Sequence, residues 1–393
     1  MNEFMRIGDI CNILNGYAFK SSKYVADGIR VIRITNVQKG FVEDTNPQYY
    51  PVSEQREIEK YMLCEGDLLM SLTGNVGRVG LLSAEMLPAA LNQRVACIRI
   101  RNPAVIYKPF LFHLLNSDYF ENKCILASQG VAQKNMSTEW LKEYPIPSFS
   151  MDKQMEIASI FDKIDDLIAR RKEQVRNMDQ AVKSRFIELF GDIVLNPFGW
   201  EKEYLGVVCD VRDGTHDSPH YHSTGFPLVT SKNVTGGEID LTDCSLISEA
   251  DFNKINERSK VDMGDIIMPM IGTVGKPVIV NVKPNFAIKN VSLIKFKDDS
   301  RVLNTFIRSL LQSDYFDDAV LSKVRGGTQK FIALGDIRKL VVIVPPMELQ
   351  EQFAAFVEQT DKSKYYSSLS FRYCQAAANT YRLEWMTCRT SDF

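Results

Sequence analysis

Short apolar runs bounded by Gly, Asn, Asp and Pro recur along the chain, and they predict β-strands. They are RVIRIT (30–35), DLLMSL (67–72), VACIRI (95–100), PLVT (227–230), DIIMPM (265–270) and VSLIKF (291–296). Helical stretches are expected at about 109–126 and 304–323. A short segment rich in proline then follows each of them, YPIPSF (144–149) or VIVPPM (342–347). This pattern predicts mixed α and β structure.

Residues 152–190 follow a different period, because their apolar positions recur at steps of three and four. This near-heptad spacing is typical of a helix that packs on a second helix. The apolar positions are Ile157, Phe161, Ile164, Ile168, Val175, Met178, Val182 and Leu189. Such a helix would be on the order of 57 Å long at about 1.5 Å per residue. Gly191 and Pro197 would end it.

The partner is expected after Gln350, where QEQFAAFVEQTD resembles QMEIASIFDKID at 154–165. Phe353, Phe356 and Val357 begin an apolar stripe that weakens further along the chain. We expect the two helices to pair as an antiparallel coiled coil. Docking of each helix along one domain face is the alternative. The tail, YCQAAANTYRLEWMTCRTSDF (373–393), has no evident counterpart of the first helix's ELFGD ending and is expected to be atypical.

The whole pattern occurs twice. GDLLMSLTGNVG (66–77) returns 198 residues later as GDIIMPMIGTVG, and LLNSDYF (114–120) returns 196 residues later as LLQSDYF. A period this long indicates duplicated domains rather than a solenoid. The predicted organisation is a first domain at 1–150, a spacer helix at 151–192, a second domain at 193–347, and a second spacer helix with the atypical tail at 348–393.

The composition of the 393 residues is ordinary for a globular protein, with 45% hydrophobic and 24% charged residues and a net charge of −2. A uniformly positive surface is therefore excluded, although a basic groove is not. The eight cysteines are scattered, with no CxxC pair, and no apolar run reaches the roughly 18 residues of a membrane span. A cytoplasmic protein with reduced thiols is expected.

Motifs for catalysis and cofactor binding are weak. GTVGKP (272–277) lacks the spacing of a phosphate loop, and the glycines of GNVGRVG (74–80) are expected to form a tight turn. DGTHDSPHYH (213–222) holds three of the four histidines, which would suit a metal, but the first copy has NGYAFKSSKY there. We therefore favour a loop that contacts a partner, and we expect no catalytic, cofactor-binding or metal-binding residues.

The recurring polar residues lie in turns, and their types are those that contact phosphates and base edges. In the first domain the DNA-binding candidates are Tyr17, Lys20, Thr35, Asn36, Thr73, Asn75, Arg78, Asn92, Gln93, Arg94, Gln133 and Lys134. In the second domain they are Thr215, His216, Ser231, Lys232, Asn233, Thr273, Lys276, Lys289, Asn290, Arg325, Thr328, Gln329 and Lys330.

Turns need Asn, Ser and Gly for structural reasons too, so each candidate has a structural alternative. Asn36 with Asn233, and Asn92 with Asn290, could be structural in both copies. The Gln-Lys pairs 133–134 and 329–330 are interpreted as phosphate contacts. Positions that differ between copies, such as Arg78 and Lys276, are better candidates for reading sequence.

The ordered set of motifs resembles the specificity subunits of type I restriction–modification systems. The matching features are the duplicated domains, the LTGNVG and MIGTVG turns, the DGTH-x-SP-x-Y loop, and the P-x(n)-Q-x(2–3)-[IF]-A opening of each spacer helix. The resemblance implies an α+β fold with two target-recognition domains and no catalytic activity. It also implies recognition of a bipartite, asymmetric DNA site in defence against foreign DNA.

By the same resemblance, two methyltransferase subunits and the restriction subunits would be partners. S-adenosylmethionine, ATP and Mg²⁺ would be bound by those partners. Three other interpretations stay open at this point: a non-catalytic protein-binding scaffold whose domains bind peptide or carbohydrate, a stand-alone enzyme that uses DGTHDSPHYH and a metal, and an inactive or orphan specificity subunit, suggested by the unusual tail.

Overall fold

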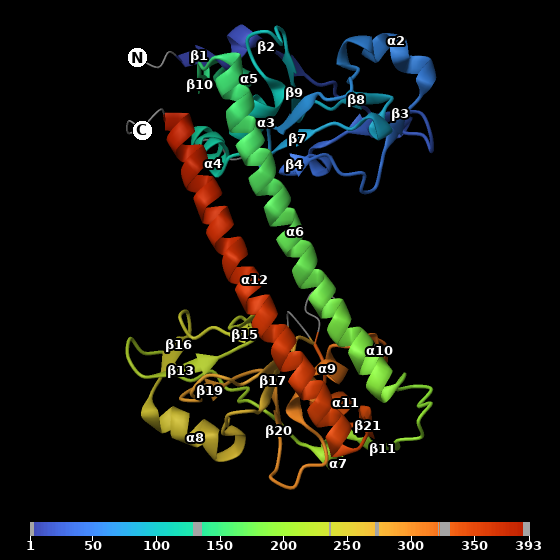
Figure 1. Cartoon of the computed structure of the whole chain (residues 1–393), viewed down its shortest axis with the longest axis vertical. Coiled ribbons are helices and arrows are strands. Elements are labelled where there is room, and N and C mark those ends of the chain that lie inside the picture. Colours follow the sequence, from blue (N-terminus) through green and yellow to red (C-terminus); the bar gives the residue numbers. More distant parts are fainter. Residues whose placement is uncertain are drawn as a thin grey trace. The chain divides into compact units, whose positions relative to one another are not determined.

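The computed structural model describes residues 4–128, 136–235, 237–271, 275–320, 322 and 331–387. The chain forms two compact units (Figure 1). One consists of Met1–Lys172 with Leu369–Phe393, and the other of Glu173–Ser368. Helices α6 (Met151–Phe190) and α12 (Met347–Thr387) contribute residues to both units.

The first domain is an α/β structure. Its helices are α1 (Ile7–Ile10), α2 (Gln55–Ile58), α3 (Lys108–Leu115), α4 (Asp118–Ala127) and α5 (Thr138–Glu143). Its strands are β1 (Phe4–Arg6), β2 (Cys11–Asn15), β3 (Ile29–Ile32), β4 (Gly40–Phe41), β5 (Tyr49–Tyr50), β6 (Leu68–Ser71), β7 (Val79–Leu81), β8 (Ala89–Leu91), β9 (Val95–Ile100) and β10 (Pro145–Pro147). One sheet has the order β2-β9-β6-β7-β4, a second has the order β5-β3-β8, and β1 pairs with β10.

The second domain repeats this plan. Its helices are α7 (Leu205–Val208), α8 (Glu249–Ser259), α9 (Asn304–Leu311), α10 (Asp314–Ala319) and α11 (Leu334–Arg338). Its strands are β11 (Glu201–Tyr204), β12 (Asp210–Asp213), β13 (Phe226–Val229), β14 (Val234–Thr235), β15 (Glu238–Ile239), β16 (Ser245–Ile247), β17 (Ile266–Pro269), β18 (Val278–Ile279), β19 (Ala287–Ile288), β20 (Val291–Lys295) and β21 (Val341–Val344). The orders β12-β20-β17-β18 and β16-β13-β19, and the pair β11-β21, follow those of the first domain. Among the described residues the main sheet differs at one edge: it has no counterpart of β4, and β14 and β15 form a separate two-stranded sheet.

The central strand of each domain is buried on both faces. Leu68 and Met70 of β6 face a core that α3 and α6 complete, whereas Leu69 packs into a separate cluster on the other face. In β17, Ile266 and Met268 pack in one cluster and Ile267 in another. Side chains of a strand alternate between faces, so a continuous apolar run is required where both faces are covered.

Each predicted single helix at about 109–126 and 304–323 is in fact two helices. In the first domain α3 ends before Ser117, whose side chain accepts a hydrogen bond of 3.1 Å from the backbone N–H of Phe120 and caps α4. In the second domain Ser313 lies between α9 and α10. The break follows from the serine of the repeated SDYF motif, because serine is favoured at the start of a helix.

A buried glutamine fastens the start of each long helix to its domain. Gln154 is fully buried; its side-chain oxygen accepts from the N–H of Tyr107 at 2.8 Å, and its amide donates to the carbonyls of Val105 and Phe149. Gln350 makes the same set of bonds in the second domain, with Leu303 as the N–H donor at 2.8 Å. This role explains why glutamine opens both spacer helices.

In the second unit the end of α6 packs against the start of α12. Phe186 and Phe190 share a core with Phe353 of α12 and Phe306 of α9, and their ring centroids lie 4.8–5.5 Å apart. Lys364 forms an ion pair with Asp179 further along, at 2.6 Å. The residue order shows that the two helices run antiparallel, since higher numbers on α6 meet lower numbers on α12.

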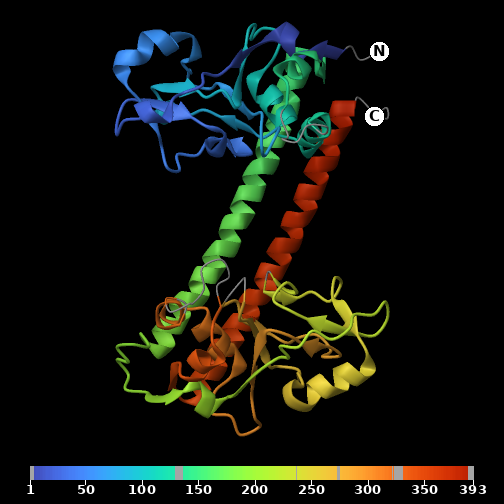
Figure 2. The ribbon, with the colours of Figure 1, turned by 180° about the vertical axis from the view of Figure 1, so that it is seen from behind.

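In the first unit the end of α12 lies beside the start of α6, and the two views agree on this (Figures 1 and 2). Arg382 donates to both carboxylate oxygens of Asp165 at 2.9 Å, and its guanidinium lies 5.1 Å from the centre of the Phe161 ring. Trp385 packs edge-on against Phe149. Helix α12 continues through the segment expected to be an atypical tail as far as Thr387.

The fold class predicted from sequence is confirmed: two α/β domains, each followed by a long helix, with the helices packed together. The helices pair with each other, as expected. Each helix end also docks into a domain core, so the alternative of docking on a domain holds in part. Among the described residues, the helices lack a segment both long and apolar enough to cross a bilayer.

Candidate nucleic-acid interface

Three loops meet at one end of the main sheet in each domain. In the first domain β2 ends, β9 begins and β6 ends at this place, since Asn15 pairs with Ala96 and Ser71 with Val95. The second domain repeats this with β12, β20 and β17. We call this end the loop edge. It consists of residues 16–20, 72–78 and 92–94 in the first domain, and of 214–218, 270–271, 275–276 and 288–290 in the second.

A glycine allows the first of these loops to cross the sheet closely. A Cβ on Gly16 would lie 2.1 Å from the carbonyl oxygen of Asn92, and one on Gly214 would lie 2.4 Å from that of Ile288. The following residues, Tyr17 and Thr215, bridge in parallel to Asn92 and Lys289. The two domains therefore build the loop edge on the same backbone.

In the first domain the loop edge brings several candidates together. Gln93 donates its backbone N–H to the carbonyl of Tyr17 at 3.0 Å, and the backbone carbonyl of Arg94 accepts the N–H of Leu72 at 3.0 Å. Thr73 follows Leu72 directly, so it lies at the same edge. The side chains of Lys20, Asn75, Gln93 and Arg94 are exposed, and that of Thr73 is half-buried. These side chains are available to a ligand.

Tyr17 is tied to its own domain. Its hydroxyl donates to the Glu57 carboxylate at 2.7 Å, and its ring packs against Phe19 and Tyr61. The hydrogen bond to Glu57 is the main cause that raises the pKa of Tyr17 above its usual value. The phenol therefore stays neutral at physiological pH.

A second group of first-domain candidates connects neighbouring loops. Arg78 donates to the side-chain oxygen of Gln38 at 2.8 Å, and Gln38 in turn donates to the backbone carbonyl of exposed Thr35 at 3.1 Å. Gly74 and Gly77 have φ angles of +67° and +88°, in the left-handed region that favours glycine. This fits the predicted tight turn.

The paired asparagines Asn36 and Asn233 hold turns together. Each is buried, and each accepts a backbone N–H three residues away while donating to carbonyls across the loop. Asn92 is buried too, and its side-chain oxygen accepts the N–H of Arg94. These contacts favour the structural alternative at Asn36, Asn233 and Asn92.

In the second domain His216 is the centre of the loop edge. Its Nε2 lies 2.9 Å from Asp213 Oδ2, and its Nδ1 lies 2.9 Å from Asn290 Oδ1. Asp213 is buried and also forms an ion pair with Arg258 of α8. Asn290 adopts a φ of +56°. The side chain of Asn290 thus binds the His216 ring, whereas that of Asn92 binds the backbone of Arg94.

Other candidates of the second domain lie around this network. Lys289 donates its Nζ to the Ser218 hydroxyl at 2.6 Å, and the Thr215 hydroxyl accepts the N–H of Asp217 at 3.1 Å. Lys232 and Lys276 are exposed, and Ser231 is half-buried. Lys276 and Lys289 thus give the loop edge two cationic groups, whereas Ser231 and Lys232 follow β13 outside it.

Some candidates cannot be placed. Gln133, Lys134, Thr273, Arg325, Thr328, Gln329 and Lys330 lie outside the described residues.

The helix-pair candidates divide into two groups. Ile157, Phe161, Ile164, Val182, Phe353 and Val357 contribute to the domain cores. Ile168, Val175, Met178 and Phe356 are half-buried. The apolar stripe at the helix ends therefore serves mainly to dock each helix onto a domain.

Sequence reasoning missed Arg258, Arg382 and Trp385. Arg258 is a polar residue of an amphipathic helix, and its bond to Asp213 spans 45 residues. A repeat comparison could have found the other two, because Arg382 and Trp385 follow Phe186 and Leu189 by 196 residues, the offset of the LLNSDYF repeat.

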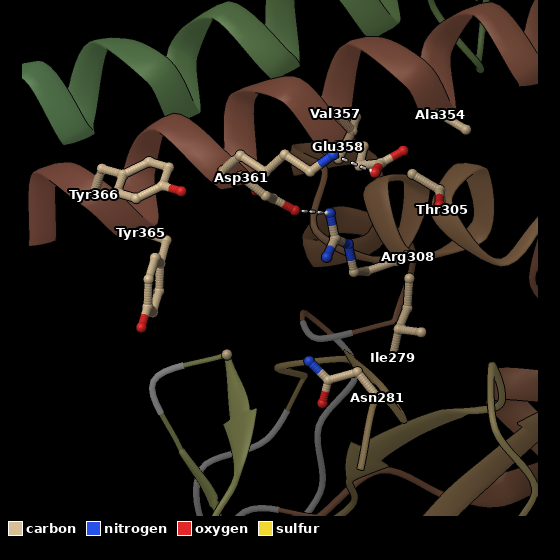
Figure 3. Close-up of a pocket in the computed structure, with 12 residues that line it drawn as sticks. Ile279, Asn281, Thr305, Arg308, Ala354, Val357, Glu358, Asp361, Tyr365 and Tyr366 are labelled. Carbon is tan, nitrogen blue, oxygen red and sulfur yellow. Dashed lines mark hydrogen bonds and ion pairs between the residues drawn. The ribbon is translucent and has the colours of Figure 1, made fainter. Parts of the chain in front are cut away.

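The second unit also has a hollow of about 450 Å³ between α12, α9 and β18 (Figure 3). Its charged side chains pair with one another, Arg308 with Asp361 at 3.1 Å and Lys362 with Glu358 at 2.7 Å. Tyr365 and Tyr366 lie at its open side. The DNA-binding candidates do not line this hollow. The part of the chain that the structure describes holds no group of three or more His, Cys, Asp or Glu side chains placed to bind a metal ion.

The duplicated scaffold has known relatives. Residues 2–177 and 197–365 match the type I restriction modification DNA specificity domain. The chain belongs to this family. It is a type I restriction–modification DNA specificity subunit and is itself non-catalytic, which confirms the sequence-based interpretation.

Two relatives of this specificity family come from Escherichia coli. The specificity subunit of the type I restriction enzyme EcoBI is 25% identical over 382 residues, which cover 89% of this chain and 77% of that one. The specificity subunit of EcoKI, from strain K12, is 22% identical over 384 residues and covers 90% and 80%. A crystal structure of the S subunit of a type I system from M. genitalium has a TM-score of 0.54 at 14% identity. It covers 98% of this chain and 96% of that chain, which supports the fold.

Proposed function

We propose that this specificity subunit binds a bipartite, asymmetric DNA site, with each domain reading one half through its loop edge. One observation carries the proposal: the two domains build the loop edge on the same backbone but place different side chains on it. Gly16 and Gly214 shape the same loop, but Tyr17 stands where the second domain has Thr215. Two copies of one scaffold with different side chains suit two different half-sites.

The candidate side chains divide by role. Exposed Lys20, Lys232 and Lys276 suit contacts with the phosphate backbone, since lysine supplies a point charge. Exposed Gln93 and Arg94 can donate to base edges in the major groove. Under this proposal the lysine–phosphate contacts set the affinity for DNA, and Gln93 and Arg94, in the turn after β8, help to recognise the base sequence.

The catalytic work would belong to other chains. Two methyltransferase subunits would bind α6 and α12 and supply S-adenosylmethionine, and restriction subunits would join them with ATP and Mg²⁺. The exposed faces of these helices, which carry Leu167, Tyr365, Tyr366 and Tyr373, offer surface for such partners. In keeping with this assignment, a fold neighbour with a TM-score of 0.52 at 18% identity is described as a structure of type I complex assembly.

The helices would also set the distance between the half-sites. α6 is one uninterrupted helix over Met151–Phe190. Inserting one helical turn within 165–183 should change the spacing of the recognised halves and leave their sequences unchanged. Unchanged spacing would contradict this part of the proposal.

The direct test is DNA binding by the chain purified with its methyltransferase partner. Specific duplex should be bound with an affinity that falls steeply as salt rises, because counterions are released from the phosphates. A scaffold for protein or carbohydrate would bind no specific duplex. The tail on which the orphan interpretation depended is helical as far as Thr387, and Trp385 packs against the core of the first unit.

A further inference from the structure

Both ring nitrogens of His216 face oxygen atoms that accept hydrogen bonds. Nε2 lies 2.9 Å from a carboxylate oxygen of Asp213, and Nδ1 lies 2.9 Å from the side-chain oxygen of Asn290. A neutral imidazole has one N–H and one bare nitrogen, so it can donate to one of these acceptors. The imidazolium ion donates to both. The geometry therefore fits the protonated ring.

The two acceptors are themselves held in place. Asp213 lies at the end of β12, its side chain is 10% exposed, and its other oxygen is bound by Arg258 of α8. Asn290 lies in the turn between β19 and β20, where its backbone N–H donates to the carbonyl of Thr215 at 3.2 Å. The ring is thus clamped between a strand end and a turn.

The first domain has the same turn without this clamp. At the offset of 198 residues that relates the two GD motifs, Ala18 stands for His216, Asn15 for Asp213 and Asn92 for Asn290. The neighbouring Tyr17 holds the loop instead, through its neutral hydroxyl and Glu57. A change of protonation near neutral pH can therefore alter this loop in the second domain but not in the first.

We propose that His216 is a proton-controlled positioning residue of the second domain. As the imidazolium, it ties the DGTH loop to Asn290 and places a positive charge at the loop edge, which strengthens binding of the DNA half-site read by this domain. This inference rests on the proposed function. It adds that the two half-sites respond differently to pH.

The surrounding charges support the direction of the effect. Hydrogen bonding to Asn290 raises the pKa of His216 most, the bond to Asp213 raises it further, and partial burial and Arg258 act against them. Among the described residues, the other charged groups at this loop are Lys289, which is bound to Ser218, and exposed Asp217. The net result is a pKa above the ordinary histidine value.

The sign of the pH dependence follows from this shift. A group whose pKa is higher in the folded protein stabilises the fold fully below its unfolded pKa, which is about 6.5 for histidine. That contribution is lost as the pH rises through the raised, folded pKa. Over the same range the ring loses its positive charge and one of its two hydrogen bonds. Binding through the second domain should for that reason weaken above about pH 6.5, while binding through the first should not.

The experiment measures binding of the complex with its methyltransferase partner to specific duplex between about pH 5.5 and 8.5, at constant ionic strength. Affinity should fall on the order of threefold to fivefold across the titration, the size of a partly exposed charge contact. Duplexes altered in one half-site should show which half is responsible. The loss of affinity with rising pH should disappear when the half read by the second domain is altered and persist when the other half is altered. His216→Gln should bind at the high-pH level throughout, and His220→Gln, in the same loop, should retain the wild-type profile.

Titration of the His216 ring by NMR in the free chain tests the clamp without DNA. The pKa should lie above the ordinary value, and Asn290→Gly, which tolerates the same backbone angle, should lower it. A pKa at or below the ordinary value, or specific binding that does not change with pH, would overturn the inference and leave the proposed function standing. The absence of specific binding at every pH would contradict the proposed function itself.

Discussion

The two domains share a backbone plan and differ in the side chains that complete it. The order of the four shared strands of the main sheet, the parallel pairs β3-β8 and β13-β19, and the close approach at Gly16 and Gly214 are the same in both. The groups that close the loops differ: a tyrosine bound to Glu57 in one domain, and a histidine clamped by Asp213 and Asn290 in the other. Apolar runs and glycines thus fix the scaffold and leave the loop side chains free to differ.

The same contrast holds where the long helices end. Phe186 and Phe190 at the end of α6 enter an aromatic core in the second unit. At the corresponding place in the first unit, α12 presents Arg382, which is bound to Asp165. One helix end is held by apolar burial, and the other by a charged contact together with the packing of Trp385 on Phe149. The second kind is expected to be more sensitive to salt.

The largest effect is expected at the apolar helix end. Phe186→Ala should destabilise the second unit by about 4 kcal/mol, because it leaves a cavity among packed rings. Arg382→Ala should cost the first unit about 2 kcal/mol, since it removes the two hydrogen bonds to Asp165 and the contact with the Phe161 ring. Urea unfolding followed separately for each unit would measure both values. Ile187→Ala and Arg372→Ala, at exposed positions of the same helices, are matched controls.

The two helix ends would not differ as proposed if Phe186→Ala and Arg382→Ala lowered the free energy of unfolding equally. The same holds if the stability lost in Arg382→Ala did not depend on salt.

The buried glutamines should behave alike in both units. Gln154→Leu and Gln350→Leu should each cost about 3 kcal/mol, because buried backbone groups such as the N–H of Tyr107 lose their partner. Unfolding of each unit measures the cost, with exposed Gln352→Leu as the control. A loss confined to one of the two units would show that the duplicated fastening is not equivalent.

The glycines of the loop edge come next. Gly16→Ala and Gly214→Ala should each destabilise one domain by about 2 kcal/mol, since the new Cβ meets a backbone carbonyl. Each should weaken recognition of one half-site, which methylation of duplexes altered in one half would detect. Gly335→Ala is the control, because a Cβ there meets nothing within 4 Å. Weakening of both half-sites by one variant would contradict independent reading.

The smallest effect is expected at Tyr17. Tyr17→Phe removes the bond to Glu57 but keeps the ring contacts with Phe19 and Tyr61, so stability should change little. DNA binding by this variant should keep the wild-type pH profile. A pH dependence altered as strongly as in His216→Gln would contradict the assignment of that dependence to the second domain.

Much of the scaffold could be predicted from the sequence. The buried runs around Leu69 and Ile267, the repeat and the near-heptad stripe of α6 each result from local patterns. Local patterns did not predict the docked tail, because Arg382 and Trp385 replace an apolar ending. Only the repeat offset places them at the positions of Phe186 and Leu189. Helix α12 is therefore held by contacts distant in sequence.

The candidate site was only partly predictable. Turn chemistry selected loops that the structure gathers at the loop edge, where Lys20 and Arg94 are exposed; their contact with DNA stays a prediction. The same chemistry also selected Asn36 and Asn233, whose side chains close turns. Sequence alone could not reveal that His216 is clamped, because its partner Asn290 lies 74 residues away.

The central claim is that one scaffold, present twice, reads two independent halves of a DNA site. The most direct measurement replaces residues 1–150 with the corresponding domain of a relative that reads another sequence. The methylated adenines are then mapped with the methyltransferase partner present. The account predicts that one half of the recognised site changes, while the other half is retained. A change in both halves, or methylation at sites without a bipartite sequence, would contradict it.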